Sequence, residues 1–350
     1  MEIGIIAAHN IRYSPYIFYY TNILDNLKIK YELIYPDKSK LNEEFPQTKN
    51  PVEWNNRLPS ILNYYFYSSK VKKIIKEKRY DGLIVLTTIN VAYLSTYLKK
   101  NYNNKYIVDI RDYTHEDKKS FYFLEKIGIT HAALRVISSK KFEKFLPINK
   151  YFTCHNLSMT NLEKKFKWKK PDKEIIIGHV GSISYKEPCK KLINLIKNDE
   201  RFEFHIYGNE SDEKEIEKLV TSINCDRIKY FGPYTPDDKG KIINSVDILF
   251  NTYGNGIPLL DYAVSNKMYD AMYYKKLILT SPNTYMEELG GKIAYSIDYE
   301  NDRSLDRLYN WIKVLDSNEI QEYQDRMMEK FINENRNTEN KVIETIDNWR

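Results

Sequence analysis

Residues 265–281, SNKMYDAMYYKKLILTS, place a lysine and a carboxylate at the start of a short predicted helix. Ser265 or Asn266 can cap this helix, whose N-terminus offers free N–H groups and a positive dipole end to an anion. Lys267 adds a full positive charge, and Asp270 projects from the same face of the helix. The pattern predicts phosphate binding by the first turn and binding of sugar hydroxyls by Asp270, which suits a nucleotide sugar. An ordinary capped surface helix has the same residue types.

A second phosphate-binding loop is predicted in GHVGSISYKEP, residues 178–188. A strand at 175–180 runs into Gly181 and Ser182, where glycine lets the backbone approach a phosphate, and Lys186 can supply charge. The segment has neither the P-loop ending nor a G-x-G-x-x-G fingerprint. A plain turn between a strand and a helix remains the alternative.

Two further loops follow predicted strands of the same half. The sequence TYGNGIP at 252–258 carries Gly254, and a second loop carries Tyr234 after Gly232-Pro233. Ligands of open α/β sheets bind beyond the carboxyl ends of the strands. We therefore expect Gly254 to border the ligand and Tyr234 to stack on a nucleobase, although an exposed tyrosine in a turn is the simpler interpretation.

The first half contains a crowded polar loop at 109–117, DIRDYTHED. Asp112 and His115 can contact a sugar acceptor there, and His115 can act as a base. A charged surface loop in which Asp109 pairs with Arg111 is the alternative.

The loop at 7–15, AAHNIRYSP, follows the first predicted strand. Its polar residues His9, Asn10 and Arg12 can contact an acceptor or a phosphate. A structural loop without ligand contacts explains these residues equally well.

The order of apolar segments predicts an α/β protein with two Rossmann-like halves, because strand and helix patterns alternate, stop at a charged linker, 161–173, and then restart. Strands are expected at 3–8, 31–35, 82–87, 106–110, 132–138, 175–180, 202–207, 228–231, 246–251, 277–280 and 294–297. Helices are expected at 15–28, 56–78, 91–100, 140–145, 188–197, 212–222 and 235–244, at the start of 265–281, and twice or more in 303–350.

Composition and charge narrow the function further. The chain has 350 residues and no apolar run long enough to span a bilayer, and its start does not resemble a signal peptide. Three scattered cysteines suit a reducing cytoplasm, and the six histidines do not cluster. Residues 1–170 hold 30 Lys and Arg against 16 Asp and Glu, a net charge of +14, whereas residues 171–350 hold 24 against 32, a net charge of −8. The first half is therefore expected to face an anionic partner.

Residues 57–80, RLPSILNYYFYSSKVKKIIKEKRY, combine aromatic and basic side chains on one predicted helix. Basic residues near an anionic leaflet contribute about 1 kcal/mol each, so the pattern predicts docking on the inner face of a membrane. A solvated helix with its aromatic residues in the core is the alternative. Nucleic-acid binding is a further alternative that no motif supports.

Four segments in this order resemble the donor domain of family-4 glycosyltransferases with the GT-B architecture: GHVGSISYK, FHIYGNESDEKEIEKLV, IKYFGPYTPDDKGKIINSVDILFNTYGN and SNKMYDAMYYKKLILTS. The first half is similar to that family through VDIRD, RVISSKKFEKFL and FTCHN. The resemblance implies that Asp270 binds the donor ribose, that Lys186 neutralises phosphates and that Asn266 and Lys267 hold the diphosphate. Tyr262 stands where the family often has a first glutamate, with Asp261 one residue away, and Ser182 stands where an arginine is common.

The resemblance implies an acceptor- and membrane-facing domain at 1–157, a donor domain at 158–319 across a cleft, and C-terminal helices, about 320–350, that pack back on the first domain. The expected activity is a retaining transfer of a hexosyl group from a nucleotide diphosphate sugar, UDP favoured over GDP, to a lipid-linked or polysaccharide acceptor in capsule or lipopolysaccharide synthesis. No metal or other cofactor is expected, since the sequence has no D-x-D triplet. The expected location is cytoplasmic and peripheral to the membrane. A nucleotide-sugar epimerase of the same fold and a binding-only homologue remain alternatives.

Overall fold

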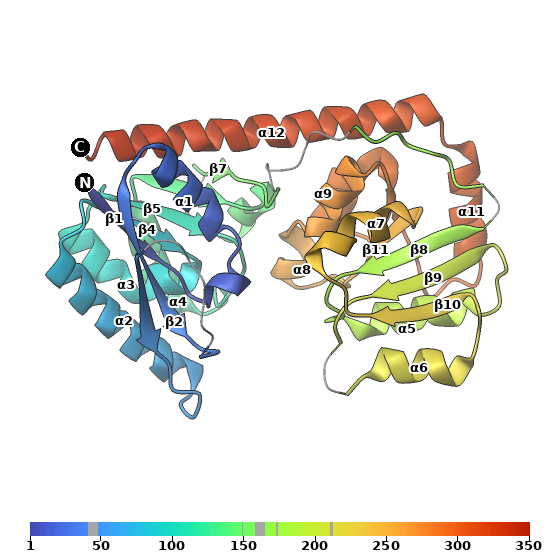
Figure 1. Cartoon of the computed structure of the whole chain (residues 1–350), viewed down its shortest axis with the longest axis horizontal. Coiled ribbons are helices and arrows are strands. Elements are labelled where there is room, and N and C mark those ends of the chain that lie inside the picture. Colours follow the sequence, from blue (N-terminus) through green and yellow to red (C-terminus); the bar gives the residue numbers. More distant parts are fainter. Residues whose placement is uncertain (41–47, 149, 158–164, 173, 211–212) are drawn as a thin grey trace. The chain divides into compact units, whose positions relative to one another are not determined.

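The computed structural model describes residues 1–350 except 41–47, 149, 158–164, 173 and 211–212. The chain forms two compact units, each with its own parallel sheet (Figure 1). The first unit comprises Met1–Asn156 and Asn333–Arg350, and the second comprises Leu157–Ile332. The long C-terminal helix α12, Ser317–Asp347, therefore begins in the second unit and ends in the first.

The first unit contains a seven-stranded parallel sheet in the order β3-β2-β1-β4-β5-β6-β7. Its strands are β1 Glu2–Ile6, β2 Lys30–Asp37, β3 Thr48–Glu53, β4 Gly82–Leu86, β5 Tyr106–Ile110, β6 Leu134–Ile137 and β7 Phe152–Thr153. Its helices are η1 Ile11–Tyr13, α1 Ile17–Asn26, α2 Ser60–Lys78, α3 Thr88–Asn101, α4 Lys119–Thr130 and η2 Lys140–Lys144, with the end of α12.

Both faces of this sheet are covered by helices, as parallel sheets require. Helices α2, α3 and α4 lie on one face, whereas α1 and the end of α12 lie on the other (Figure 1). The core on the second face joins α1 to α12 through residues such as Tyr20, Leu33 and Ile346. The ring of Trp349 fills the place where a side chain on Gly82 would lie, 2.1 Å from an added Cβ. The C-terminal residues are thus part of the first unit's core.

The second unit contains a six-stranded parallel sheet in the order β10-β9-β8-β11-β12-β13. Its strands are β8 Ile175–Val180, β9 Phe202–Tyr207, β10 Ile228–Gly232, β11 Ile248–Asn251, β12 Leu277–Thr280 and β13 Ala294–Ser296. Its helices are α5 Lys186–Ile196, α6 Glu215–Ile223, η3 Pro236–Asp238, α7 Lys239–Asn244, α8 Pro258–Tyr262, α9 Asn266–Tyr273, α10 Tyr285–Gly290, η4 Gly291–Ile293, α11 Ser304–Val314 and the start of α12.

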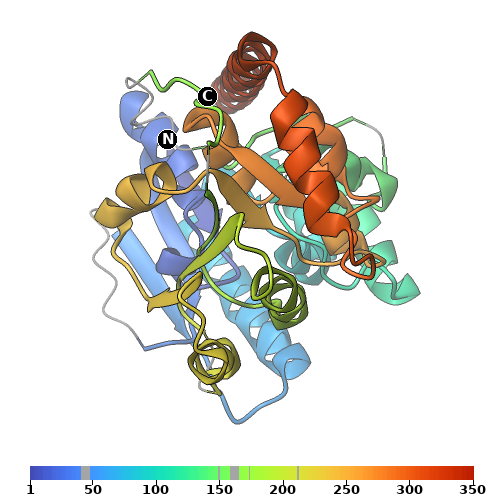
Figure 2. The same cartoon turned by 90° about the vertical axis from the view of Figure 1, so that its right-hand side faces the viewer.

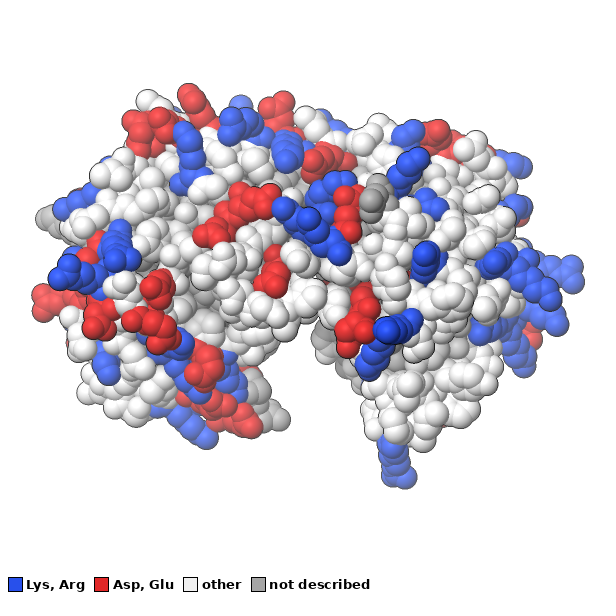
Figure 3. Space-filling model, turned by 180° about the vertical axis from the view of Figure 1, so that it is seen from behind, with Lys and Arg blue, Asp and Glu red and all other residues white. Residues whose placement is uncertain are grey.

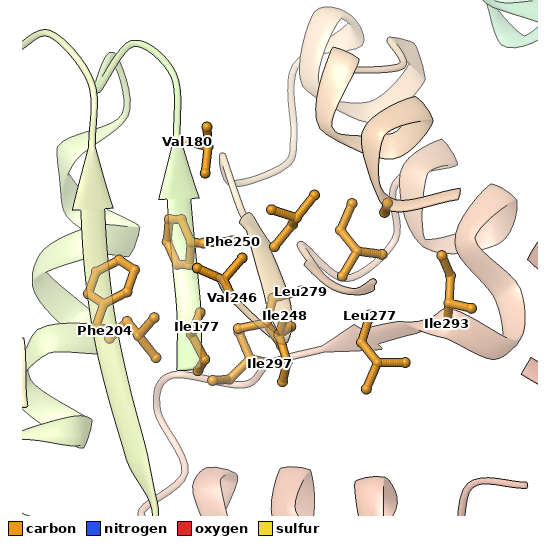
Figure 4. Packing of buried hydrophobic residues seen from close by; sticks show 14 of the residues in the cluster. Ile177, Val180, Phe204, Val246, Ile248, Phe250, Leu277, Leu279, Ile293 and Ile297 are labelled. Atoms are coloured by element: carbon orange, nitrogen blue, oxygen red, sulfur yellow. The ribbon is translucent and has the colours of Figure 1, made fainter. Parts of the chain in front are cut away.

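Helices α5 and α6 lie on one face of this sheet, and α7 and α9 lie on the other (Figures 1 and 2). The strands carry near-continuous apolar runs because both faces are buried. Phe204, Ile248 and Leu279 come from three strands and meet in one buried cluster (Figure 4). This packing fixes the carboxyl ends of the strands, where the predicted site residues lie.

The two Rossmann-like parallel sheets confirm the predicted fold class, and several elements differ in detail. Strands β3 and β7 and helices α4, α8 and α10 were not expected, because they are short or lack a clear period. The segment 140–145 is a 3-10 helix, η2, and α2 begins after Pro59, whose fixed φ suits a position before a helix. Part of the predicted linker, 161–164 and 173, lies outside the described residues. None of the helices in the described part of the chain has the length and apolar composition needed to cross a bilayer.

Candidate functional site

The order of strands in the second sheet reverses between β8 and β11, which lie side by side. These strands are paired only at Ile177–Ile248 and Gly178–Leu249, although β8 continues to Val180 and β11 to Asn251. Ligands of doubly wound folds bind at such a switch point, outside the carboxyl ends of the strands. The loops after β8 and β11 are therefore the first place to look for a ligand.

The loop after β8 is held by its neighbours through backbone hydrogen bonds. Gly181 has φ +128° and its N–H donates to the Tyr207 carbonyl at 3.0 Å, and the N–H of Ile183 donates to the Asn209 carbonyl at 2.9 Å. A Cβ added to Gly208 would lie 1.7 Å from the Gly181 carbonyl oxygen. Glycine at both positions thus permits a close backbone approach that fixes the loop containing Ser182, which is exposed.

The loop after β11 is anchored by two serines. The Ser281 hydroxyl accepts hydrogen bonds from the N–H groups of Tyr253 and Gly254 at 3.1 and 2.9 Å. Ser265 occupies the N-cap position of α9, but its hydroxyl donates to the Asn251 side chain at 2.5 Å instead of capping the helix. The expected capping interaction is absent from Ser265, and the serine instead ties the start of α9 to the end of β11.

Lys267 projects from the first turn of α9 toward the loop after β8. Its Nζ lies 3.8 Å from a Cβ built on Gly181 and donates to the Tyr253 hydroxyl at 2.9 Å. The side chain is buried, with 7% of its surface exposed, and no carboxylate among the described residues forms an ion pair with it. A buried cation without a counter-ion is costly, so this position is suited to an anionic ligand.

His179 and Tyr253 also interact with Lys267 at the switch point, through its charge and through a hydrogen bond. Burial and the Lys267 charge lower the pKa of His179 to about 3, so its ring is neutral. The Tyr253 ring lies 5.2 Å from that of Tyr185 on the facing loop. Tyrosine is so abundant in this chain that no sequence signal distinguishes Tyr253 from the others.

Asp270 forms an ion pair with Lys239 at the start of α7, at 2.7 Å. Burial raises the pKa of Asp270, while Lys239 and Lys267 oppose the shift. Burial raises the pKa of Tyr234, and the negative charge of Asp270 raises it further, so the two predicted donor residues lie within electrostatic range of each other. Lys239, whose pairing with Asp270 no local sequence pattern predicts, is therefore a further residue of this group.

Lys186 is the first residue of α5, and its ammonium is engaged by two carboxylates. It lies 2.6 Å from Glu215 and 3.0 Å from Glu213. Asn266, the first residue of α9, is exposed beside Lys267. The structure thus brings Gly181 and Lys267 together, and Tyr234 and Asp270 together, whereas the charge of Lys186 is already compensated.

In the first unit, His9 and Asn10 follow β1 and meet Lys38, which follows β2. The Nζ of Lys38 lies 3.1 Å from His9 Nδ1, and the Asn10 side chain accepts from the N–H of Lys38 at 3.0 Å. Desolvation and the Lys38 charge lower the pKa of His9. Arg12 is exposed on η1. No local sequence pattern predicts that Lys38 belongs to this group, because it is distant from His9 and Asn10 along the chain.

Asp112 and His115 both follow β5, and both are exposed. The His115 ring packs edge-on against Phe121 at 5.6 Å. Asp109 and Arg111 form the structural ion pair that was the alternative for this loop, at 2.6 Å, and both residues are buried. No group of three or more His, Cys, Asp or Glu side chains within the described residues is placed to hold a metal ion.

The outer face of α2 has an apolar half followed by a basic half. Ile61, Leu62, Tyr65 and Phe66 are each 45–68% exposed, whereas Tyr64 and Tyr67 are buried. Further along the same face, Lys70 and Lys73 each have an exposed carboxylate partner, at 3.4 and 3.9 Å, and Lys76 is also exposed. Lys and Arg side chains crowd the margin of the first unit, at the right of Figure 3. We call Ile61, Leu62, Tyr65 and Phe66 the α2 apolar patch.

Comparison with known proteins assigns the fold. No protein-family model and no curated protein sequence matches the chain. Sucrose-phosphate synthase from Thermosynechococcus elongatus is similar in structure, with a TM-score of 0.69 and 12% identity over 95% of this chain and 94% of that one. Anabaena HepE in complex with UDP and glucose has a TM-score of 0.69 and 12% identity over 99% and 100% of the chains. The lipopolysaccharide outer core galactosyltransferase WaaB has a TM-score of 0.65 and 15% identity over 98% and 99%. The two Rossmann-like units of this chain therefore have the GT-B fold of these glycosyltransferases.

Proposed function

We propose that the protein is a glycosyltransferase that takes its sugar from a nucleotide diphosphate sugar. The observation that carries the proposal is the position of Lys267, a buried cation without a carboxylate partner among the described residues, next to Gly181 at the switch point of the second sheet. The N–H groups of α9 begin at the same place. The GT-B fold supports the same conclusion, since it is shared with the galactosyltransferase WaaB and with HepE, whose structure contains UDP and glucose.

In the proposed reaction, the bond between the anomeric carbon and the diphosphate oxygen breaks, and an acceptor hydroxyl forms the new bond. Negative charge develops on the diphosphate, where Lys267 and the first N–H groups of α9 stabilise it. Asp270 and Lys239 bind the ribose, and Tyr234 stacks on the base. This scheme assigns the neutralising charge to side chains and requires no metal or other cofactor.

The acceptor is proposed to bind the first unit, through His9, Asn10 and Arg12, with His115 or Asp112 taking the proton of the attacking hydroxyl. UDP is the proposed nucleotide, since the similar HepE structure contains UDP and glucose. We propose that a hexosyl group is transferred with retention of the anomeric configuration, as the resemblance to family-4 glycosyltransferases implies. A lipid-linked or polysaccharide acceptor in cell-surface glycan synthesis is consistent with the name of WaaB.

We further propose that the first unit docks on the inner face of a membrane through the α2 apolar patch and the lysines beyond it. Apolar side chains enter the acyl boundary, and each nearby lysine contributes about 1 kcal/mol at an anionic leaflet. Tyr65→Ser with Phe66→Ser should weaken sedimentation with phosphatidylglycerol vesicles by about tenfold. The control is Phe231→Ser with Val314→Ser, which are exposed apolar residues of the second unit. Equal binding by both double variants would refute this docking surface.

Activity is tested by incubating the protein with UDP- and GDP-sugars, with and without a lipid-linked acceptor, and following nucleotide release and products by mass spectrometry. The proposal predicts nucleotide release and a glycosylated acceptor only when both substrates are present. Conversion of the nucleotide sugar without an acceptor would identify an epimerase instead. Donor binding without turnover for any acceptor would identify a binding-only protein.

A further inference from the structure

A pocket of about 350 Å³ lies between α2 and α3, at the edge of the first sheet that is opposite to the predicted acceptor residues. Its lining includes Tyr80 and Lys105, which come just before β4 and β5. His9 and His115, by contrast, follow the carboxyl ends of their strands. The pocket is therefore distinct from the proposed acceptor site, and its volume is sufficient for a small ligand.

Three cations line this pocket: Lys76, Arg79 and Lys105. All three are exposed, and none forms an ion pair with a carboxylate in the described part of the chain. The pocket also contains one carboxylate, Asp81, whose Oδ2 accepts a hydrogen bond from the N–H of Glu2 at 2.7 Å and is thereby directed to the start of β1. The lining thus carries a net positive charge.

Basic residues at helix C-termini often only complement the helix dipole. This does not explain all three cations of the pocket. Lys105 lies beyond the end of α3, in the turn that leads to β5. The terminal carbonyls also have partners, since Ile75 O accepts from Arg79 N at 2.9 Å and Leu98 O from Tyr102 N at 2.8 Å. The charges of the pocket therefore come from the C-terminal end of α2 and from the turn that precedes β5.

Aromatic walls give the pocket a defined shape. The rings of Tyr97 and Tyr102 lie 6.4 Å apart, and the Tyr102 hydroxyl donates to the Tyr80 carbonyl at 3.1 Å. Asn101 donates to the Tyr97 carbonyl at 3.0 Å, which fixes the end of α3. Phosphate groups are well suited to convergent Arg and Lys donors, because charge-assisted hydrogen bonds are roughly twice as strong as neutral ones.

We propose that the α2–α3 pocket binds a phosphate-bearing anion at a site separate from the nucleotide-sugar site. The phosphate can belong to a soluble compound or to the headgroup of an anionic lipid. Binding of a lipid headgroup rests on the proposed membrane docking, since Lys76 lies on the same exposed face of α2 as the α2 apolar patch. Binding of a soluble phosphate compound does not depend on the proposed function.

The test uses the full chain with Lys267→Gln, so that phosphate binding at the proposed donor site does not contribute. Inorganic phosphate is titrated by calorimetry, and phosphatidylcholine vesicles with and without phosphatidic acid are used in sedimentation. In this background, Arg79→Asn with Lys105→Gln should weaken binding of one probe at least about tenfold. Asparagine is chosen because Arg79 has φ +56°, which asparagine tolerates.

The control is Lys99→Gln with Lys100→Gln, which removes the same charge from exposed residues of α3 that do not line the pocket. It should change binding by less than about twofold. Loss confined to inorganic phosphate identifies a soluble ligand, and loss confined to vesicles identifies a headgroup. The proposal would be overturned if the pocket variant and the control variant bound each probe equally well. This holds whether both variants keep binding or both lose it. If circular dichroism shows that the pocket variant is misfolded, Lys105→Gln alone is compared with Lys100→Gln by the same criterion.

Discussion

Gly208, which follows the carboxyl end of β9, is under a severe steric constraint. A Cβ at Gly208 would lie 1.7 Å from the backbone oxygen of Gly181, which cannot move without displacing the loop after β8. Gly208→Ala should therefore lower the free energy of unfolding by at least about 3 kcal/mol. Gly256→Ala is the matched control, since Gly256 has φ +90° but no atom within 4 Å of an added Cβ. Urea denaturation measures both, and equal losses would show that the close approach to Gly181 is unimportant.

Glu125 on α4 is a buried carboxyl group without a hydrogen-bond partner in the described structure. Burial, and then the Glu116 charge, raise the pKa of Glu125 from 4.5 to about 9. The native state thus holds a proton that the unfolded state releases between these values, so stability present at pH 4.5 is lost as the pH rises toward 9. Relative to Glu125→Gln, the wild type should lose about 1.4 kcal/mol of unfolding free energy per pH unit between pH 5 and 8. If the free energies of unfolding of the wild type and of Glu125→Gln changed equally with pH, the raised pKa of Glu125 would be contradicted.

Among the elements, α12 has one asparagine that forms two hydrogen bonds with the backbone of the first unit. The Asn335 side chain accepts from the N–H of His155 at 2.7 Å and donates to the carbonyl of His155 at 3.1 Å. Asn335→Ala leaves both buried backbone groups without these partners, so the free energy of unfolding should fall by about 2–4 kcal/mol. Asn337→Ala, an exposed position on the same helix, should change it by less than about 0.5 kcal/mol. A similar small effect at both positions would show that this attachment does not stabilise the unit.

Elements with a strong local pattern were predictable from the sequence. The apolar strands at 106–110, 175–180, 202–207 and 277–280 have the predicted bounds, because short runs of Ile, Leu, Val and Phe flanked by polar residues suit buried parallel strands. Strand β3, TKNPVE, has no such run and contains a proline, which an edge strand tolerates. Only pairing with β2 shows that it is a strand.

At the scale of the whole molecule, the sequence predicted which loops form the candidate site, but it did not predict the pairing of charges across it. The order of the strands brings Gly181 beside Lys267, although 86 positions of chain separate them. Lys239 and Lys186 show the limit of the prediction. Their carboxylate partners, Asp270, Glu213 and Glu215, depend on contacts between different helices and loops that no local pattern contains.

The proposed function requires that the second unit bind the diphosphate of a nucleotide sugar through Lys267. Calorimetric titration with UDP tests it most directly, with Lys186→Gln as the control because that lysine is already paired with two glutamates. We expect that Lys267→Gln weakens UDP binding at least about tenfold and that Lys186→Gln weakens it less than about threefold. Unchanged affinity in Lys267→Gln, or a larger loss in Lys186→Gln, would contradict it.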